Sequence, residues 1–285
     1  KALTDMTVGA AAYADEILTM STVTGMSTES LQAYKYAAEL VDVSMELDDF
    51  DTVAEMHLLL GRLLPDAEAR RACLLAAAEV TRDRLGHPAD ALTIFTGLLK
   101  VDENDAVARD AARDLARKTE NVRVLMDILR HDVATAVDSN ARNAALLESA
   151  TVSLRIDVND TDGAIEALRL VLLDDPSNVA AVRLCESIYD DHEAAPEAAR
   201  LLIDAAERSG DGELLVRTLR IAIGQTGDPV ERAAKLKTVG TTLVKLDRNA
   251  EAVEAFADAF LERPSEPETL RDLFDQLVRL ERPEL

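Results

Sequence analysis

Two alanine-rich helical segments recur as a pair three times along the chain, and this recurrence limits the fold more than any other feature of the sequence. In each copy, an alanine of the first segment is followed nineteen residues later by an alanine of the second. The pairs are Ala72 with Ala91, Ala145 with Ala164, and Ala233 with Ala252. Self-similarity on this scale is typical of repeat proteins, in which each unit buries its apolar face against its neighbours. The sequence therefore predicts a stack of helical units rather than one closed core.

The charge balance limits the classes of partner. The 285 residues include 31 Lys and Arg against 54 Asp and Glu, which gives a net charge of −23. Nucleic-acid binding needs a basic surface that displaces counterions, so this composition argues against a nucleic-acid partner. No apolar run reaches the roughly 20 residues that a membrane-spanning helix needs. We therefore predict a soluble protein without membrane insertion, with the cytoplasm favoured over the periplasm, whose acidic field favours partners that are basic overall.

Hydrophobic periodicity and helix-end signals divide the chain from residue 28 onward into short helices. The expected helices cover residues 28–47, 51–63, 66–85, 88–100, 104–118, 121–136, 140–157, 162–174, 178–191, 195–209, 212–225, 229–247, 249–262 and 266–281. The N-terminal part differs from this pattern. One helix is expected over residues 4–20, followed by a loop over the Ser- and Thr-rich run 21–28.

Several residues are predicted to begin or end helices. Asp228 before Pro229 is expected to cap a helix N-terminus, and Ser265 before Glu266-Pro267 repeats that arrangement. Three glycines stand where helices should end, because glycine tolerates the left-handed conformation found there. They are Gly86, Gly210 and Gly227.

The clearest packing pattern lies in residues 229–262. The stripe Leu236, Val239, Leu243 and Leu246 falls on one face of the helix 229–247. Gly240 lies on the buried side of this helix, where its missing side chain admits the next helix. A glycine inside a helix costs ~1 kcal/mol relative to alanine, so close packing is a physical reason for its presence.

These residues resemble the tetratricopeptide repeat family. In that family a small residue on the first helix is followed twelve positions later by an alanine on the second, then by a large apolar residue, another alanine and a proline. The matching residues are Val239, Gly240, Leu243, Ala252, Phe256, Ala259 and Pro264. Looser copies hold Cys185, Tyr189, Ala198, Leu202 and Ala205; then Ala164, Leu168 and Pro176; then Ala91 and Phe95, with Glu103 in place of proline. The first helices of the looser copies drift by a residue, and the tryptophan common early in the family motif is missing.

The resemblance implies an all-α fold, a right-handed α-solenoid of stacked antiparallel helix hairpins (TPR-like), which binds proteins and carries no catalytic residue. The second-helix alanines are spaced by 73 residues (Ala91 to Ala164) and 88 residues (Ala164 to Ala252). The first interval approximates four helices, and the second adds about one more. Such spacing looks like the divergent repeat arrays of large bacterial multidomain proteins. We therefore expect an N-terminal helix and linker in residues 1–27 and one continuous array in residues 28–285, belonging to a longer protein.

No constellation for catalysis or metal binding stands out. The histidines, His57, His87, His131 and His192, have no second ligand at a metal-binding spacing. The two cysteines, Cys73 and Cys185, are interpreted as buried free thiols. The run D-V-N-D-T-D-G-A-I (157–165) resembles a calcium loop, but a register with Gly163 at its sixth position puts Val158 and Arg169 where carboxylates are required. Asp162 is instead expected to be a helix N-cap, and we predict no catalytic residue, cofactor or metal.

The segment 229–248 is locally rich in basic residues, unlike the rest of this acidic chain. It gives the candidate binding residues Arg232, Lys237, Thr241, Lys245 and Arg248. Lys237, Thr241 and Lys245 are four residues apart and share one face of a helix. Two interpretations remain open. The face is solvated and held by pairs with nearby carboxylates, or it contacts an anionic peptide. In the tetratricopeptide family some members hold a peptide's terminal carboxylate with lysine and asparagine, and the asparagine is absent here.

The sequence favours a non-catalytic protein-interaction scaffold that binds a protein or peptide, either basic overall or with an acidic terminus, along its concave face. Two alternatives stay open: a sensor or regulatory repeat domain of a larger signalling or enzyme protein, and a self-associating structural module. The last expected helix has apolar positions Leu270, Leu273, Phe274 and Leu277 that need a neighbour. We therefore expect the chain to be a fragment of a longer array, with its terminal repeat able to bind a further helix or a second copy.

Overall fold

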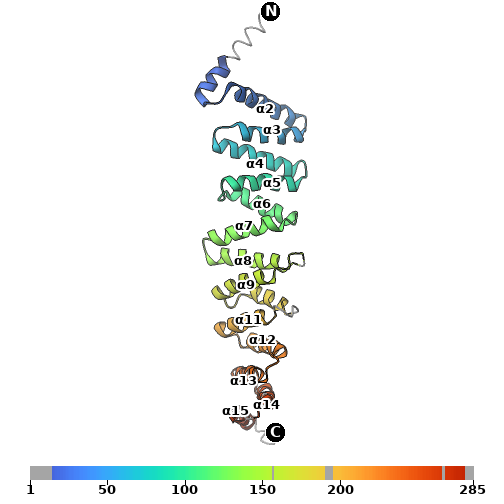
Figure 1. Ribbon diagram of the computed structural model, residues 1–285, viewed down its shortest axis with the longest axis vertical. Helices are drawn as coiled ribbons and strands as arrows, with labels where there is room; N and C mark the ends of the chain where they lie inside the picture. The colour runs from blue at the N-terminus through green and yellow to red at the C-terminus, as the bar shows by residue number, and fades with distance from the viewer. Residues whose placement is uncertain (1–14, 156, 190–194, 265–266, 280–285) are drawn as a thin grey trace, which may run out of the picture. The chain divides into compact units, whose positions relative to one another are not determined.

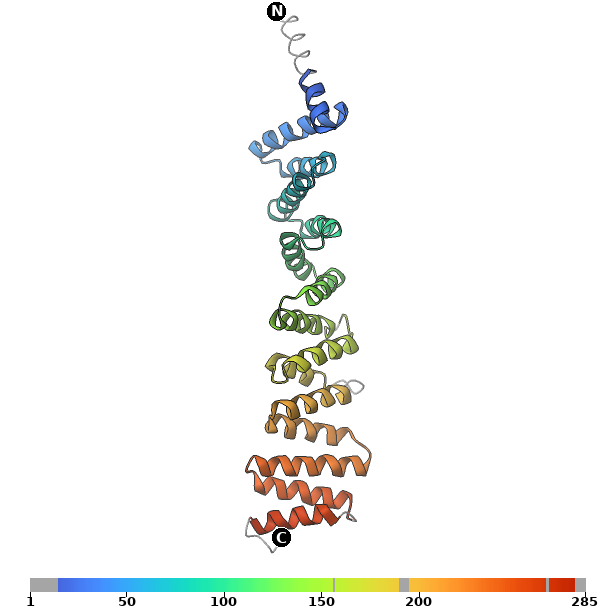
Figure 2. The same cartoon turned by 90° about the vertical axis from the view of Figure 1, so that its left-hand side faces the viewer.

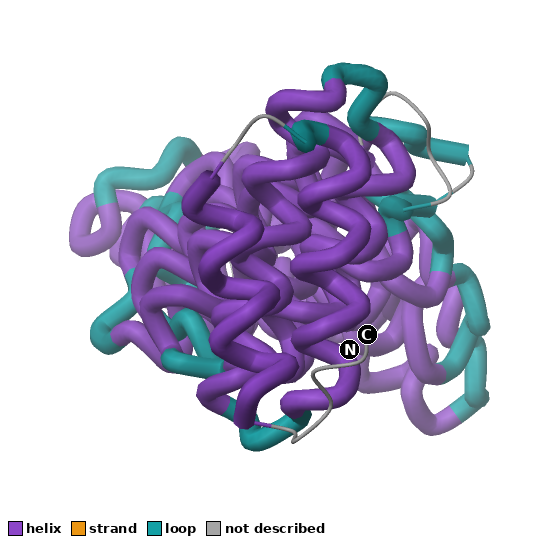
Figure 3. Tube along the Cα trace, turned by 90° about the horizontal axis from the view of Figure 1, so that it is seen from below, coloured by secondary structure: helices purple, strands orange, loops and turns teal. Residues whose placement is uncertain are grey.

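The computed structural model describes residues 15–155, 157–189, 195–264 and 267–279 (Figure 1). The chain divides into two compact units, residues 1–128 and residues 129–285. Helices and loops make up everything that is described, and no strand occurs in these ranges (Figure 3). Among them, no helix combines the length and apolarity needed to cross a membrane.

Every helix predicted from residue 28 onward is present, with bounds that differ from the prediction by at most four residues. The first unit contains α2 (Thr28–Glu46), α3 (Phe50–Leu63), α4 (Ala67–Asp83), α5 (Pro88–Val101) and α6 (Ala106–Lys118). The boundary between the units falls within α7 (Val122–Thr135). The second unit contains α8 (Ser139–Ser153), α9 (Thr161–Asp174), α10 (Val179–Ser187), α11 (Ala195–Ser209), α12 (Gly212–Gln225), α13 (Pro229–Lys245), α14 (Asn249–Glu262) and α15 (Pro267–Arg279).

Within each unit, helices pack mainly against their neighbours in sequence. In the first unit α2 contacts α3, and the contacts continue pairwise to α6. In the second unit the same series runs from α8 to α15, and α8 also contacts α10 while α9 contacts α11 (Figure 2). Contacts between nearest and next-nearest helices are those of a helical repeat stack. The predicted fold class, all-α and built of TPR-like helix hairpins, is confirmed.

The predicted loop over residues 21–28 is wrong in extent, because residues 15–24 are helical. Threonine hydroxyls donate to carbonyls four residues earlier, from Thr22 to Leu18 at 2.9 Å and from Thr24 to Met20 at 2.6 Å. These bonds satisfy the hydroxyls inside the helix, so the composition that suggested a loop is compatible with a helical turn. The chain turns only at Gly25, whose φ is +72°.

Most helix N-termini are capped by a short acidic or amide side chain. Asp228 accepts from the Val230 amide at the start of α13, as predicted. At α9 the cap is Asp160, which accepts from the Gly163 amide at 3.0 Å, so the predicted cap Asp162 is wrong. The helix begins at Thr161, so Asp162 already lies in its first turn. The predicted cap Ser265 of α15 lies outside the described residues.

Two of the three glycines predicted at helix ends are left-handed, Gly86 with a φ of +67° and Gly210 with a φ of +75°. Gly227 is not, because the chain there leads directly into the Asp228 cap of α13. Acidic residues take the left-handed position after three helices, at Asp48, Glu120 and Asp247. After α13, for example, the Arg248 amide donates to the Leu243 carbonyl at 2.9 Å and closes the helix end.

The residues that carry the family resemblance form the core of α13 and α14. Val239, Leu243, Ala252 and Ala259 are buried, as is Phe256. A Cβ atom placed on Gly240 would lie 2.7 Å from Cε1 of Phe256, so α14 packs against the glycine itself. The interpretation of Gly240 as a close-packing residue is confirmed.

The first helices of the looser copies follow a shifted register. Ala72 of the first alanine pair is exposed on α4, whereas Ala77 and Ala78 of the same helix are buried. The second-helix alanines Ala91 and Ala164 are fully buried. The nineteen-residue recurrence therefore marks core positions reliably only on the second helix of each pair.

The irregular spacing of the second-helix alanines has the predicted structural origin. Ala91 lies on α5 and Ala164 on α9, which is four helices later. Ala252 lies on α14, five helices after α9. The 88-residue interval therefore contains one helix more than the 73-residue interval.

Five ion pairs join positions on or capping helices that are two apart in sequence, and thus one helix hairpin apart in the stack. Their separations are 28 to 34 residues: Arg71 with Asp105, Arg169 with Glu197, Arg217 with Glu186, Arg220 with Glu251, and Lys237 with Glu268. Most of these pairs are exposed, and such pairs each contribute at most about 1 kcal/mol. They favour the register of neighbouring hairpins more than they stabilise the fold.

Both cysteines are free thiols, and their burial leads to a testable difference in reactivity. Cys185 is fully buried in the core of α8–α11, and burial raises the pKa of its thiol to about 12. Cys73 is only partly buried, so the interpretation of both thiols as buried is wrong for this residue, and its milder burial still raises the pKa of its thiol. In a Cys73→Ser variant at pH 8, we expect Cys185 to react with a disulfide reagent only as fast as the structure opens, with the rate rising in urea. Labelling of native Cys185 at the rate of a free thiol would contradict this.

Candidate functional site

The five candidate residues predicted from sequence lie on or just after α13. Arg232 and Lys237 are partly exposed, whereas Thr241 and Lys245 are exposed on the helix surface. Arg248 is the residue immediately before α14. Lys237, Thr241 and Lys245 do lie on one side of α13, beside the buried stripe, as the spacing predicted.

Three of these cations are engaged by carboxylates of the chain itself. Arg232 pairs with Glu262 at 2.7 Å, and Lys237 pairs with Glu268 at 3.2 Å. Arg248 donates to both oxygens of Glu251, at 2.7 Å each, and to Glu213 at 2.7 Å. The pKa of the Glu251 carboxyl is lowered, first by the bond from Arg248 and then by the bond from Arg220.

The remaining two residues make no cluster with the others. The Thr241 hydroxyl donates to the Thr238 carbonyl of its own helix at 2.9 Å. Lys245 forms no ion pair with any residue that the structure describes, and it stands in the last turn of α13, where a cation is favourable. The cations point to separate carboxylates rather than to one centre. Contact of this face with an anionic peptide stays a prediction.

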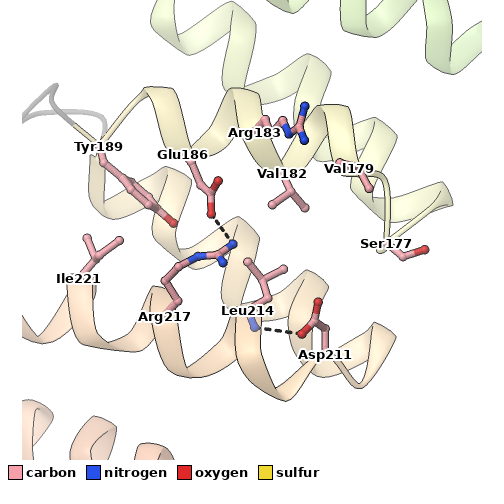
Figure 4. Close-up of a pocket in the computed structure, with 10 residues that line it drawn as sticks. All are labelled: Ser177, Val179, Val182, Arg183, Glu186, Tyr189, Asp211, Leu214, Arg217 and Ile221. Carbon is pink, nitrogen blue, oxygen red and sulfur yellow. Dashed lines mark hydrogen bonds and ion pairs between the residues drawn. The ribbon is translucent and has the colours of Figure 1, made fainter.

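A groove that the sequence did not indicate lies between α10 and α12 in the second unit (Figure 4). It is open to solvent and has a volume of about 650 Å³. Val182 of α10 faces Leu214 of α12 across it, and Val179 and Ile221 extend the apolar lining. Val182 also packs against the two cores of the unit, one formed by α8–α11 and the other by α11–α14. The groove therefore lies where these two cores meet.

Charged side chains lie along the same groove. Arg217 of α12 donates to Glu186 of α10 at 2.5 Å, which bridges the groove (Figure 4). Arg183, one helical turn before Glu186, is exposed and forms no ion pair within the described residues. Asp211 is occupied as the N-cap of α12, because it accepts from the Leu214 amide at 2.9 Å. Arg183 is thus the cation of the groove that remains open to an added carboxylate.

One end of the groove carries a buried hydroxyl. Burial raises the pKa of Tyr189 to about 12, although the neighbouring Thr218 hydroxyl lowers it somewhat. Neither hydroxyl oxygen has a hydrogen-bond partner of good geometry in the part of the chain that is described. Tyr189 is therefore neutral at physiological pH, and this end of the groove is weakly polar.

A second, smaller groove lies in the same unit between α11 and the ends of α12 and α13. Its volume is about 410 Å³, and Arg200, Ile203 and Lys235 are among its lining residues. Lys235 is fully engaged, with Thr226 at 2.6 Å and Glu231 at 2.7 Å. Because apolar and charged side chains line both grooves, the smaller one serves as a control for the α10–α12 groove.

The described residues contain no group of three His, Cys, Asp or Glu side chains that would hold a metal ion. His57 has a buried Nδ1 atom with no hydrogen-bond partner within those residues, and burial lowers its pKa. His87 precedes α5 and approaches Asp90 at 3.8 Å. His192 lies outside the described residues.

Sequence comparison gives no relative, since no protein-family model and no curated protein matches the chain. Among solved structures the chain is similar to a tetratricopeptide repeat protein from Parabacteroides merdae, at 13% identity over 86% of this chain and 99% of that chain, with a TM-score of 0.36. It is similar to a chain in the structure of Naa15/Naa10 bound to HypK-THB, at 13% identity over 87% of this chain and 39% of that chain, with a TM-score of 0.30. It is also similar to Acl4, the assembly chaperone of RpL4, at 17% identity over 88% of this chain and 98% of that chain, with a TM-score of 0.25. These values are too low to transfer any function.

Proposed function

We propose that the chain is a non-catalytic protein-interaction scaffold and that the α10–α12 groove binds an extended segment of a partner protein. The observation that carries the proposal is the open groove between two helices one hairpin apart. Its apolar lining is bordered by Arg183, a cation without an ion pair within the described residues. Stacked helices hold such a surface between neighbouring hairpins, which lowers the cost of ordering it on binding.

The lining defines the kind of segment that fits. Val179, Val182 and Ile221 supply an apolar strip for one or two apolar side chains. Arg183 supplies the charge for an acidic side chain next to them, because a guanidinium binds a carboxylate with two parallel hydrogen bonds. A segment with apolar residues beside an acidic one therefore matches the groove.

The proposal is tested by selecting peptides from a random display library against the whole chain and measuring their affinity for two matched variants. Arg183→Glu reverses the charge of the α10–α12 groove, whereas Arg200→Glu makes the same change in the smaller groove. Both arginines are exposed, and the only ion pair that either makes within the described residues is the surface pair of Arg200 with Glu197 at 3.5 Å, so neither change should disturb folding. We expect Arg183→Glu to weaken binding by about tenfold or more and Arg200→Glu to leave it within about twofold. The proposal would be refuted if the selected peptides bound the Arg183→Glu variant as tightly as the unchanged chain, or if the selection yielded no binders.

A second candidate function is self-association through α15. Leu270, Phe274 and Val278 are exposed along this helix, while Leu273 packs against the core of α11–α14. If this function holds, light scattering gives a dimer for the unchanged chain and a monomer for Phe274→Asp. A monomer for the unchanged chain at high concentration would exclude it.

A further inference from the structure

Helix α2 of the first unit carries an apolar stripe that the described residues leave exposed. Tyr36, Val43 and Leu47 are 63%, 50% and 73% exposed. Leu47 is the C-cap residue of α2, and the spacing of seven and four residues puts the three on one side of the helix, with the partly buried Leu40 between them. The stripe runs about 17 Å along the helix, at 1.5 Å per residue, which is the length of three helical turns.

An acidic stripe runs beside the apolar one. Glu39, Asp42 and Glu46 are exposed, and none of them forms an ion pair with a described residue. The only lysine of α2, Lys35, is already engaged by Glu16 at 2.6 Å. The exposed face of α2 thus presents apolar side chains next to carboxylates that form no ion pair within the described part of the chain.

The charges restrict what can cover this face. A second copy of the chain carries a net charge of −23 and would bring further carboxylates to the acidic stripe. The chain's own residues 1–14 contain one lysine and one aspartate, so they offer no surplus of positive charge. By contrast, α15 carries both Glu268 and Arg271 beside its exposed apolar stripe, so its charges favour neither an acidic nor a basic partner.

We propose that the α2 face is a docking site for a basic amphipathic helix of a partner protein. The apolar side of that helix covers Tyr36, Val43 and Leu47, and its lysines or arginines pair with Glu39, Asp42 and Glu46. Recognition of an amphipathic helix by an apolar strip with a charged border is a recurrent mode of binding. This surface belongs to the first unit and does not depend on the proposed groove in the second.

The test uses the whole chain and a synthetic peptide of about 18 residues, long enough to form a helix when bound. The peptide is built of leucine and lysine with leucine at every third or fourth position. One control peptide has the same composition in scrambled order, and another has glutamate in place of lysine. We expect binding of the patterned basic peptide only.

Two pairs of substitutions separate the apolar and the charged contributions. Val43→Ser with Leu47→Ser removes the apolar stripe, and its matched control is Val101→Ser with Leu261→Ser at exposed positions elsewhere. Glu39→Gln with Glu46→Gln removes charge, and its control is Glu79→Gln with Glu254→Gln. We expect each α2 pair to weaken binding by about tenfold or more and each control pair to stay within about twofold. The effect of the charge pair should shrink in about 1 M salt.

A photoreactive benzophenone side chain in place of Leu47 identifies the occupant directly. A crosslink to the patterned peptide supports the proposal. The proposal is overturned if Leu47 crosslinks to residues 1–14 or to a second copy and the peptide does not reduce that crosslink. It is also overturned if the scrambled peptide binds as tightly as the patterned one, or if the control pairs lose as much affinity as the α2 pairs. Because the substitutions that should weaken binding all lie on or next to α2, in the first unit, their failure leaves the α10–α12 groove proposal unaffected, and failure of the groove proposal leaves the α2 proposal unaffected.

Discussion

Replacement of Gly240 by leucine should destabilise the α13–α14 pair by about 3 kcal/mol, the upper range for overpacking a close helix contact. The physical reason is the position of Phe256, whose ring atoms lie 2.7 to 2.9 Å from the place where a Cβ atom would stand. Phe256 is itself buried, so its ring has little room to move. Even Gly240→Ala should destabilise, although alanine is the better helix former.

Gly224 provides the matched control for this prediction. It lies in the last turn of α12, and an added Cβ atom would meet nothing within 4 Å. Gly224→Ala should therefore stabilise the protein by about 0.5–1 kcal/mol through helix propensity and a less flexible unfolded chain. Glycine-to-alanine substitution is thus expected to lower the free energy of unfolding at Gly240 and to raise it at Gly224. Urea unfolding measures both changes.

A double variant tests whether the Phe256 ring is the group that clashes with a side chain at position 240. Phe256→Leu removes the ring, so Gly240→Ala combined with it should cost less than the sum of the two single changes. Strict additivity would show that the strain lies elsewhere. Hydrogen exchange should rise in α13 and α14 while the helices of the first unit keep their protection, because damage in a repeat stack stays local.

The positions of the helices could be predicted from the sequence because their signals are local. The Asp228-Pro229 start of α13 and the Gly210 end of α11 depend only on residues within one turn. The predicted cap of α9 was wrong because two local signals of similar strength competed. Asp160 and Asp162 are both capable caps, and the non-helical backbone of Asp160, whose side chain accepts from the Gly163 amide, decides between them.

The α10–α12 groove could not be predicted, because it depends on which distant helices become neighbours. Glu186 and Arg217 are 31 residues apart, and nothing near either residue indicates the other. A signal did exist in the spacing of opposite charges, since the pairs that join alternate helices recur at 28 to 34 residues. A search for arginines with a carboxylate at this separation would have included the groove pair, Arg217 and Glu186.

The cationic face of α13 could be located from the sequence, but the role of its residues could not. Its residues were found from local composition, but their roles depend on carboxylates that come from other helices. Glu262 and Glu268 engage Arg232 and Lys237 from α14 and α15. Local charge counting therefore identified exposed cations and could not distinguish a free cation from one already paired across the stack.

Replacement of Asp105 by alanine should destabilise the first unit by about 2 kcal/mol, because this side chain has two roles. It caps α6 by accepting from the Ala108 amide at 3.1 Å, and it accepts two bonds from Arg71 of α4, at 2.5 and 2.8 Å. The Asp105 side chain is only 2% exposed, whereas Arg71 is partly open to water. Asp66→Ala is the control, because Asp66 caps α4 in the same way without an ion pair, and its loss should cost about 1 kcal/mol.

The contribution of Asp105 should also depend on pH, and the sign follows from its ionisation. The bond from Arg71 is the largest of the effects that hold the pKa of Asp105 below its ordinary value. The folded state therefore favours the carboxylate, and its stabilising effect is fully present above the unfolded pKa, near 3.9, and is lost as the pH falls through the lower folded pKa. The difference in unfolding free energy between the unchanged chain and Asp105→Asn, which retains a cap acceptor, should be constant from about pH 5 to pH 8 and should shrink below about pH 4. A difference that grows on acidification would show that Asp105 is protonated in the folded protein and that Arg71 does not stabilise its charge.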